Sequence, residues 1–260
     1  MDKYESFKSK VYTLTGINLS LYKEKQMKRR ITSLGNRNGY KDFDSYFESI
    51  KKDKKLFDEF INYLTINVSE FYRNPAQWNT LEKDLLPKLV KSNRKLNVWS
   101  SACSTGEEPY SLVMLLSKFY DIKDIKITAT DIDLGAIQKA KMGVYSEKSL
   151  QNLPLDFKTK FFDKVGTSFK VKDIVKNCVD FKQMNLLEDK YPSGYNLILC
   201  RNVLIYFTEE AKDLIYKKFH DALTDDGILF VGSTEQIIMP ERYNLKSSKM
   251  FFYEKTTHNS

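Results

Sequence analysis

The stretch from residue 95 to residue 116, KLNVWSSACSTGEEPYSLVMLL, constrains the fold of this chain most strongly. It begins with an apolar, β-prone run around Val98 and Trp99, turns through small residues from Ser100 to Gly106, and continues with the apolar side of a helix. Such a strand-turn-helix unit opens many α/β sheets, in which ligands bind at the carboxyl ends of the strands. Small side chains in the turn let a ligand approach the backbone closely. An ordinary strand-to-helix connection is the alternative for this stretch on its own.

The chain after residue 95 alternates between apolar strand-like runs and helical patterns. Such alternation predicts a mostly parallel sheet with helices on both faces. A helix is expected over 208–223, with Thr208 as its N-cap. The other predicted elements are strands at 125–133, 168–171, 178–181, 195–202, 228–231 and 250–253, and a turn at 225–227.

Residues 1–66 have few strand-like alternations and predict a small helical domain with one break, at 35–39. They carry 14 Lys and Arg against nine Asp and Glu, and so contribute most of the net charge of +8. Lys25 and Arg29 are four residues apart and share a helix face, opposite an apolar stripe that includes Ile31. A basic surface of this kind attracts acidic partners, although a merely solvated basic face fits the pattern equally well.

Composition excludes several classes of protein. The sequence has no apolar run of about 18 residues, and its first residues lack the apolar segment of a secretion signal. The three cysteines are far apart in the sequence and odd in number, which argues against a disulfide framework and against a zinc site. We therefore expect a cytoplasmic protein that does not insert into membranes.

Two further residues are candidates for ligand binding. Asp131 lies at the acidic end of the second predicted strand, 25 residues after Gly106, where an acidic side chain accepts hydrogen bonds from ribose hydroxyls. The alternative for this carboxylate is a helix N-cap, a role that Asp133 can also fill. Arg73 stands beside aromatic residues just before the break at 74–75, and it precedes the predicted ligand-binding unit.

The chemistry of the loop distinguishes between candidate ligands. A dinucleotide needs a G-x-G-x-x-G loop to bring its pyrophosphate onto the helix N-terminus, but this loop has only Gly106. Glu107 and Glu108 follow directly and would repel a pyrophosphate. Two carboxylates suit a ligand that carries a cationic amino group and a ribose. S-adenosylmethionine has both, so the residues favour a methyl donor.

Six motifs in one order give the chain a strong resemblance to the CheR-type glutamate O-methyltransferases of chemotaxis receptors. The resemblance covers nearly the whole chain, and six linked motifs are far more specific than a single glycine loop. The motifs are N-V-S-E-F-Y-R (67–73), S-A-C-S-T-G-E-E-P-Y-S (101–111), T-D-I-D (130–133), N-L-L (185–187), C-R-N-V-L-I-Y-F (200–207) and D-G-I-L-F-V-G-S-T-E (226–235).

The resemblance implies an α/β protein of two domains. A small all-helical domain (1–66) is followed by a linker of strand and helix (67–94) that contributes to the donor pocket. A Rossmann-like class I methyltransferase domain (95–260) comes next, with a small β-subdomain inserted at about 166–180. In some relatives this subdomain binds a receptor peptide by strand addition. The connection here, DKVGTSFKV, is short, so we expect no such tether.

The resemblance also implies which residues bind S-adenosylmethionine. Either Glu107 or Glu108 supplies the carboxylate for the methionyl amino group, and the sequence leaves open which. Asp131 is expected to hold the ribose. Ser69 stands where the family usually has Thr, a change that keeps the hydroxyl. The other expected donor contacts are Asn67 and Arg73 along the pocket, Asn185 and Leu186 beside the adenine, and Arg201 and Asn202 near the methionyl end.

Arg73 and Tyr206 are implied as the residues that border the transfer site. Arg73 is expected to steer the acceptor carboxylate and Tyr206 to orient it by hydrogen bonding, although Tyr206 fits a packing role as well. An exposed glutamate, with a pKa of about 4.3, is already ionised near neutral pH, so we expect neither a general base nor a metal. Catalysis should then come mainly from holding donor and acceptor roughly 3 Å apart.

The implied activity is methyl transfer from S-adenosylmethionine to the γ-carboxylate of specific receptor glutamates. This protein-glutamate O-methyltransferase reaction gives methyl esters for sensory adaptation, with S-adenosylhomocysteine as the other product. The expected partner is the acidic helical bundle of methyl-accepting chemotaxis receptors, contacted by the basic N-terminal domain. We expect a monomer that binds no nucleic acid.

Three alternative functions compete with this one. A non-catalytic signalling module that binds S-adenosylmethionine would need the same motifs. A nucleic-acid methyltransferase typically carries an Asn/Asp-Pro-Pro-aromatic run, whereas residues 201–204 read RNVL. A cysteine-nucleophile enzyme built on Cys103 would need a histidine, but His220 and His258 both lie outside the motifs.

Overall fold

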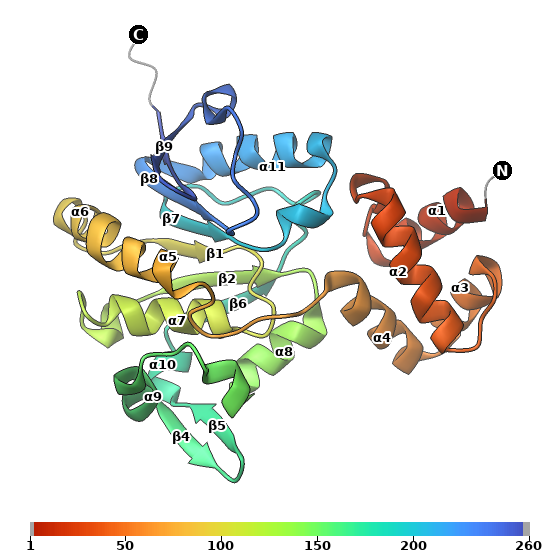
Figure 1. Cartoon of the computed structure of the whole chain (residues 1–260), viewed down its shortest axis with the longest axis horizontal. Helices are drawn as coiled ribbons and strands as arrows, with labels where there is room; N and C mark the ends of the chain where they lie inside the picture. The colour runs from red at the N-terminus through yellow and green to blue at the C-terminus, as the bar shows by residue number, and fades with distance from the viewer. Residues whose placement is uncertain (1–2, 257–260) are drawn as a thin grey trace. The chain divides into compact units, whose positions relative to one another are not determined.

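The computed structural model describes residues 3–256, which form two compact units. The helical unit contains the chain up to Asn67 together with residues 204–214. The sheet unit contains residues 68–203 and the chain from Ile215 onward. Figure 1 shows the elements of both units with their labels, and each unit is described by itself.

The helical unit is built on four helices with an aromatic core. Phe7 lies at its centre, where its ring contacts the rings of Phe43, Phe47 and Phe60. Asp42 caps one helix by accepting hydrogen bonds from the backbone N–H groups of residues 44 and 45. The helices are α1 (Lys3–Thr15), α2 (Glu24–Arg37), α3 (Phe43–Lys52) and α4 (Lys54–Thr65), with a 3₁₀ turn, η1 (Leu19–Leu21).

Helix α2 carries the basic residues that the sequence singled out. Its predicted apolar stripe is confirmed, because Met27, Ile31 and Leu34 are buried. The predicted break at 35–39 begins too early, since the helix continues through Gly35 to Arg37. A Cβ atom at Gly35 would lie 3.3 Å from the Tyr46 ring, so this glycine lets α2 and α3 pack closely.

Residues 204–214 complete the helical unit, although they come late in the sequence. They include the short helix η5 (Leu204–Tyr206) and the first residues of α11 (Glu209–Ala222). Phe207 forms an isolated antiparallel bridge with Tyr22, and the two ring centroids are 4.9 Å apart. The backbone N–H of Lys23 donates to the carbonyl of Tyr206 (2.9 Å).

The sheet unit is built on a mostly parallel sheet of seven strands within the described residues, which confirms the predicted α/β class. Along the sheet the order is β6-β2-β1-β7-β8-β10-β9, with β10 antiparallel to both of its neighbours. The strands are β1 (Val98–Ser100), β2 (Ile127–Asp131), β6 (Val179–Gln183), β7 (Tyr195–Cys200), β8 (Leu223–Val231), β9 (Leu245–Lys249) and β10 (Phe252–Lys255).

Apolar side chains cover both faces of this sheet. Val98 belongs to the core cluster that contains Trp78, whereas the ring of its neighbour Trp99 packs against Phe219 of α11. Successive residues of a strand point to opposite faces, so one strand serves two cores. The other helical elements of the unit are α5 (Pro75–Thr80), the π-helical turn η2 (Leu81–Leu85), α6 (Leu86–Ser92), α7 (Glu107–Leu116), η3 (Ile122–Asp124), α8 (Leu134–Met142), η4 (Glu147–Leu150), α9 (Leu155–Phe161), α10 (Asp173–Lys176) and η6 (Pro240–Tyr243).

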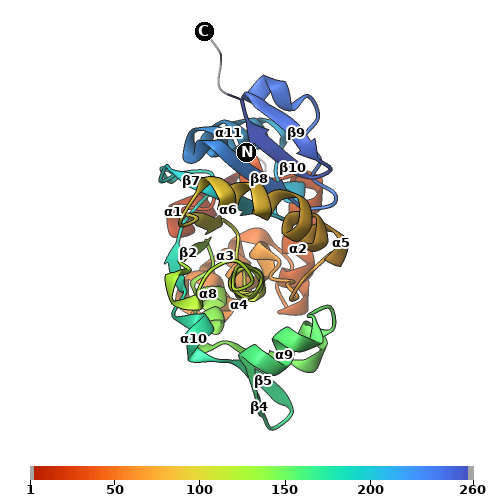
Figure 2. The same cartoon turned by 90° about the vertical axis from the view of Figure 1, so that its left-hand side faces the viewer.

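A second, antiparallel sheet of order β3-β5-β4 belongs to the sheet unit. Its strands are β3 (Val144–Ser146), β4 (Phe162–Val165) and β5 (Ser168–Val171). Figures 1 and 2 show β4 and β5 beside α9 and far from β8. The subdomain predicted at about 166–180 is therefore misplaced in part. The predicted strand at 178–181 is β6, which pairs with β2 of the main sheet.

Other predicted elements also differ from the structure in part. Residues 67–74, all of them described, form no strand, because the chain turns there through residues with positive φ. The turn predicted at 225–227 is a bulge within β8: Leu223 pairs with Tyr195 and Ile228 with Leu197, so residues 224–227 leave the ladder with β7. Strand β9 was not predicted. Among the helices that the structure describes, none is long and apolar enough to cross a membrane.

Candidate functional site

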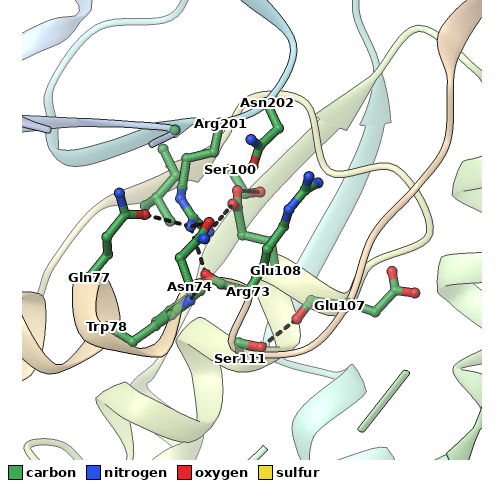
Figure 3. A network of polar contacts seen from close by, with 12 residues as sticks. Arg73, Asn74, Gln77, Trp78, Ser100, Glu107, Glu108, Ser111, Arg201 and Asn202 are labelled. Atoms are coloured by element: carbon green, nitrogen blue, oxygen red, sulfur yellow. Dashed lines mark hydrogen bonds and ion pairs between the residues drawn. The ribbon is translucent and has the colours of Figure 1, made fainter. Parts of the chain in front are cut away.

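The polar residues that the sequence singled out gather at the carboxyl ends of the central strands. Ser100 ends β1, Asp131 ends β2, and Arg201 follows directly after β7. Glu107 and Glu108 begin α7, which follows the loop from β1. Figure 3 shows the network of contacts that joins the first turn of α7, the end of β7 and the start of α5.

Gly106 fixes the loop between β1 and α7. Its φ of +93° favours glycine, and a Cβ atom there would lie 2.8 Å from the Cβ of Ala140 on α8. The Tyr145 hydroxyl supports the same loop by donating to the carbonyl oxygen of Thr105 (2.6 Å). This glycine is therefore required by the packing of the protein itself, whereas the sequence had suggested close approach of a ligand.

Glu108 is paired within the protein. Its Oε1 accepts a hydrogen bond from the Ser100 hydroxyl (2.8 Å), and its Oε2 accepts one from Nη1 of Arg201 (3.3 Å). Only 12% of the Glu108 side chain and 2% of the Arg201 side chain are exposed. Burial raises the pKa of the Glu108 carboxyl, and the neighbouring guanidinium opposes that rise. This carboxylate is committed to a buried ion pair.

Glu107 has different surroundings. Its side chain is buried and accepts hydrogen bonds from the hydroxyls of Thr105 (2.7 Å) and Ser69. Among residues 3–256, no ion pair involves this carboxylate. Burial raises its pKa, because the negative charge lacks a cation to compensate for lost hydration. Such a group favours a cationic ligand.

Asp131 is a second buried carboxylate in the same region. Its two oxygens accept hydrogen bonds from the backbone N–H groups of Ser104 (2.7 Å) and Asp133 (3.0 Å). Burial raises the pKa of Asp131 to about 6. Asp133 is the N-cap of α8 and accepts from the N–H groups of residues 135 and 136, so the capping alternative belongs to Asp133. Asp131 instead connects the β1–α7 loop to the end of β2 through its hydrogen bond from Ser104.

The backbone around Arg73 is strained. Tyr72 and Asn74, on either side of it, have φ of 53° and 61°, a region that residues other than glycine rarely adopt. The Arg73 carbonyl oxygen accepts two hydrogen bonds, from Nε1 of Trp78 (3.0 Å) and from Nη2 of Arg201 (2.7 Å). The Arg73 side chain is partly exposed, and its Nη1 donates to the carbonyl of Val68 (3.2 Å).

The Arg201 guanidinium contacts several groups of the protein. Besides Glu108 and the Arg73 carbonyl, its guanidinium donates to Oε1 of Gln77 (2.8 Å) and approaches Oδ1 of Asn74 (3.4 Å). It also lies over the ring of Phe230, 4.5 Å from the ring centroid. Burial lowers the pKa of this guanidinium, and Glu108 opposes the effect.

Asn202, the residue after Arg201, has a φ of 61° and is held by a buried acid. Its backbone N–H donates to Oε2 of Glu235 (2.6 Å), and the same oxygen accepts from the N–H of Gly232 (2.9 Å). The turn after β7 and the turn after β8 are thus tied to one carboxylate.

Asn185 and Leu186 lie in the loop after β6. The Asn185 side chain accepts a hydrogen bond from the N–H of Leu187 (3.0 Å), which shapes a tight turn. Leu186 is buried, and its carbonyl accepts from the Tyr191 hydroxyl (2.8 Å). The structure thus gives both residues a defined position in the sheet unit.

Asn67 and Tyr206 belong to the helical unit. The Asn67 amide donates to the hydroxyl of Thr65 (2.9 Å) and to Oδ1 of Asn62 (3.3 Å). The structure brings together Ser69, Arg73, Glu107, Glu108, Asp131, Arg201 and Asn202 in the sheet unit, through the contacts given above.

Sequence reasoning missed three residues of this network, namely Gln77, Trp78 and Glu235. The first two follow Pro75 in a short helix and contact residues that are distant in the sequence, which no local pattern reveals. Glu235 stood in a quoted motif, but it received no role. Its burial next to strained backbone is visible only in the fold.

Nucleophilic cysteine chemistry finds little support at this site. Cys103 is buried, and burial raises the pKa of its thiol well above the usual range, so it is a poor nucleophile. Within the part of the chain that the structure describes, no cluster of His, Cys, Asp and Glu could hold a metal ion.

The chain is similar to known methyltransferases along most of its length. A family model described as "CheR methyltransferase, SAM binding domain" matches residues 67–252, and one described as "CheR methyltransferase, all-alpha domain" matches residues 2–65. The chemotaxis protein methyltransferase of Listeria monocytogenes is 43% identical over 93% of this chain and 92% of its own length. That of Borreliella burgdorferi is 34% identical over 90% of each. Among solved structures, a TehB-like SAM-dependent methyltransferase from Corynebacterium glutamicum covers 70% of this chain and 94% of its own, with 16% identity and a TM-score of 0.39.

Proposed function

Because this chain belongs to the CheR family of S-adenosylmethionine-dependent methyltransferases, we propose that it methylates glutamate side chains of chemotaxis receptors. The methyl group goes to the γ-carboxylate, and the product is a glutamyl methyl ester. The acceptor is the cytoplasmic helical bundle of the receptors. The relatives that share most of their length with this chain are named chemotaxis protein methyltransferases, which supports this choice of acceptor.

One observation carries the assignment of the donor site. Glu107 follows the β1–α7 loop and Asp131 accepts a hydrogen bond from that loop; both carboxylates are buried, and neither is neutralised by an ion pair among the described residues. S-adenosylmethionine supplies an activated methyl group, and it brings an ammonium group and a ribose that match these two acids. The residues therefore fit the donor. The remaining donor contacts are proposed at Asn67, Ser69, Arg73, Asn185, Leu186 and Asn202.

Glu107 is the better candidate for the methionyl ammonium group. Glu108 already shares its two oxygens between Ser100 and Arg201. The partners of Glu107 are two hydroxyls and a backbone N–H, all of them uncharged, so a cationic ligand compensates its buried charge. We propose that Glu107 binds the donor and that Glu108 supports the protein around it.

The chain's contribution to the reaction is mainly positional. The acceptor carboxylate is ionised at neutral pH, so the proposed mechanism uses neither a general base nor a metal. Arg73, held by two hydrogen bonds to its carbonyl, is proposed to steer the acceptor carboxylate. Tyr206 is proposed to orient it. Arg73→Ala is expected to remove most methyl transfer while the protein stays folded.

The basic face of α2 is proposed to guide the receptor. Lys25, Lys28 and Arg29 line a shallow hollow of about 480 Å³ on this helix. Opposite charge speeds encounter and sets orientation more than it adds affinity. Binding to receptor-containing membranes should therefore weaken as ionic strength rises from low to physiological values. Salt-independent binding would contradict this part of the proposal.

The direct test supplies labelled methyl donor and membranes that contain chemotaxis receptors, and then applies mild base. Label that enters the receptor band and is released by base indicates a carboxyl ester and supports the proposal. If S-adenosylhomocysteine binds in calorimetry but no receptor is labelled, the donor site stands, and the chain either methylates another acceptor or is a donor-binding signalling module. A monomer in size-exclusion chromatography is expected throughout.

A further inference from the structure

We propose that Arg201 is a positioning residue for methyl transfer, which holds the strained backbone at Arg73 in place, and that it is not a contact of the donor. This inference rests on the proposed role of Arg73 at the transfer site. It assigns the buried Glu108–Arg201 pair to that same task. The sequence had placed Arg201 near the methionyl end of the donor.

The first argument is the set of groups that the Arg201 side chain contacts. Nη2 donates to the Arg73 carbonyl and to Gln77, and Nη1 donates to Glu108. Figure 3 shows the guanidinium between Gln77, Glu108 and the 73–74 backbone. Both terminal nitrogens are therefore committed to the protein. Nε is buried and has no acceptor among residues 3–256, and Nη1 gives one of its two N–H groups to Glu108, so most of the hydrogen-bonding capacity of the guanidinium is used within the protein.

The second argument is the strain of the backbone that Arg201 holds. Tyr72 and Asn74 both have positive φ, a conformation that is unfavourable for tyrosine and better tolerated by asparagine. Strained backbone persists only where several contacts hold it. Here the Ser111 hydroxyl accepts from the N–H of Tyr72 (3.2 Å), and two donors hold the Arg73 carbonyl. Without Arg201, the segment is free to relax, and the Arg73 side chain moves with it.

The third argument concerns Glu108. A lone buried guanidinium is costly, and its carboxylate partner both neutralises it and fixes its plane. Ser100 in turn fixes the carboxylate (2.8 Å). Direct contacts therefore connect Ser100 to Glu108, Glu108 to Arg201, and Arg201 to the Arg73 carbonyl. They link the end of β1 to the proposed transfer site.

The test uses Arg201→Lys, Arg73→Ala and the double variant in the full chain. A lysine keeps a positive charge beside Glu108, but it cannot bind Gln77, Glu108 and the Arg73 carbonyl in the same geometry. S-adenosylhomocysteine affinity is measured by calorimetry, and methyl transfer is measured on receptor-containing membranes. Amide hydrogen exchange reports the order of residues 71–77. Arg94→Lys, at an exposed position, is the matched control and should leave all three readouts unchanged.

Arg201→Lys is expected to change the S-adenosylhomocysteine affinity by less than about tenfold, because no donor contact is lost. Methyl transfer should fall about 100-fold, as expected when a reacting partner is misplaced. Exchange within residues 71–77 should increase. The double variant should transfer methyl no more slowly than Arg73→Ala alone, because Arg201 acts through Arg73.

Two results would overturn the proposal. One is a loss of S-adenosylhomocysteine affinity of about tenfold or more with unchanged exchange at 71–77, which would make Arg201 a donor contact. The other is a double variant whose fold-decrease in methyl transfer equals the product of the fold-decreases in Arg201→Lys and Arg73→Ala. If the wild-type chain labels no receptor, the proposed function fails, while affinity and exchange still decide the role of Arg201.

A second variant covers the case in which Arg201→Lys does not fold. Trp78→Phe removes the other donor to the Arg73 carbonyl and leaves the Glu108–Arg201 pair intact. The same pattern is expected with a smaller loss of transfer: S-adenosylhomocysteine affinity retained and exchange at 71–77 increased. Unchanged exchange and unchanged transfer in this variant would contradict the idea that the Arg73 backbone must be held.

Discussion

Glu107 and Glu108 are neighbours in the first turn of α7, yet their carboxylates have different partners. Glu108 is hydrogen-bonded to Ser100 and paired with Arg201, whereas Glu107 accepts hydrogen bonds from hydroxyls and a backbone N–H and has no cationic partner among residues 3–256. Figure 3 shows the two side chains pointing in different directions. A cationic ligand therefore gains more from Glu107, and the stability of the protein depends more on Glu108.

Glu108→Gln should destabilise the protein. The substitution leaves the Arg201 guanidinium buried without an anion, a change that typically costs about 3 kcal/mol or more. Urea denaturation measures the loss of unfolding free energy. The control is Glu82→Gln, which breaks a more exposed pair with Lys118 and should cost less than about 1 kcal/mol. Equal losses in the two variants would contradict a special role for the buried pair.

Donor-site affinity should depend on pH through Asp131. Its pKa is raised to about 6 in the folded protein, so the carboxylate is ionised above that pH and can accept hydrogen bonds from ribose hydroxyls. S-adenosylhomocysteine should therefore bind best above pH 7 and more weakly as the pH falls through 6. Calorimetry from pH 5 to 8 measures this. Protonation of Glu107, whose pKa is also raised, acts in the same direction.

Asp131→Asn provides the control for that prediction, because it should weaken binding at pH 8 and flatten the profile near pH 6. The same pKa has a consequence for stability. The folded protein keeps the Asp131 proton where the unfolded chain, with a pKa of 3.8, has lost it. This residue therefore favours folding less as the pH rises from about 4 to 6. If the pH profile of S-adenosylhomocysteine binding is the same in Asp131→Asn as in the wild type, another group controls the pH dependence of binding.

Gly106→Ala should destabilise the sheet unit by more than its backbone angle alone explains. The new methyl group would lie 2.8 Å from the Cβ of Ala140, in addition to the strain of a φ of +93°. Overpacking of this kind typically costs about 1–3 kcal/mol. Gly194→Ala is the matched control, since its φ is +88° but nothing lies within 4 Å of the new Cβ. Thermal denaturation of both variants isolates the crowding, and identical melting temperatures would disprove it.

Local patterns predicted the parts of this fold that depend on nearby residues. The β1–α7 unit was expected from one apolar run, one small-residue loop and one amphipathic helix, and the structure confirms the unit. Asp131 was found by its distance from Gly106. Both signals lie within a few tens of residues, because consecutive strands of such a sheet pair directly.

The remaining features depend on contacts between distant residues. Nothing local distinguishes Glu107 from Glu108, because the partner that separates them, Arg201, is 93 residues away from Glu108. The small sheet was misplaced because the pairing of β6 with β2 removes residues 179–183 from it. The roles of the predicted site residues stay proposals until binding and transfer are measured.

The most direct measurement of the central claim is the affinity of S-adenosylhomocysteine for Glu107→Gln and Glu108→Gln, compared with the wild-type chain at pH 8. Loss of a charged hydrogen-bond partner is expected to weaken binding to Glu107→Gln about tenfold or more. Glu108→Gln, measured at a temperature where it remains folded, should bind within about tenfold of the wild type. If Glu108→Gln loses the affinity and Glu107→Gln keeps it, the assignment of the donor carboxylate is wrong.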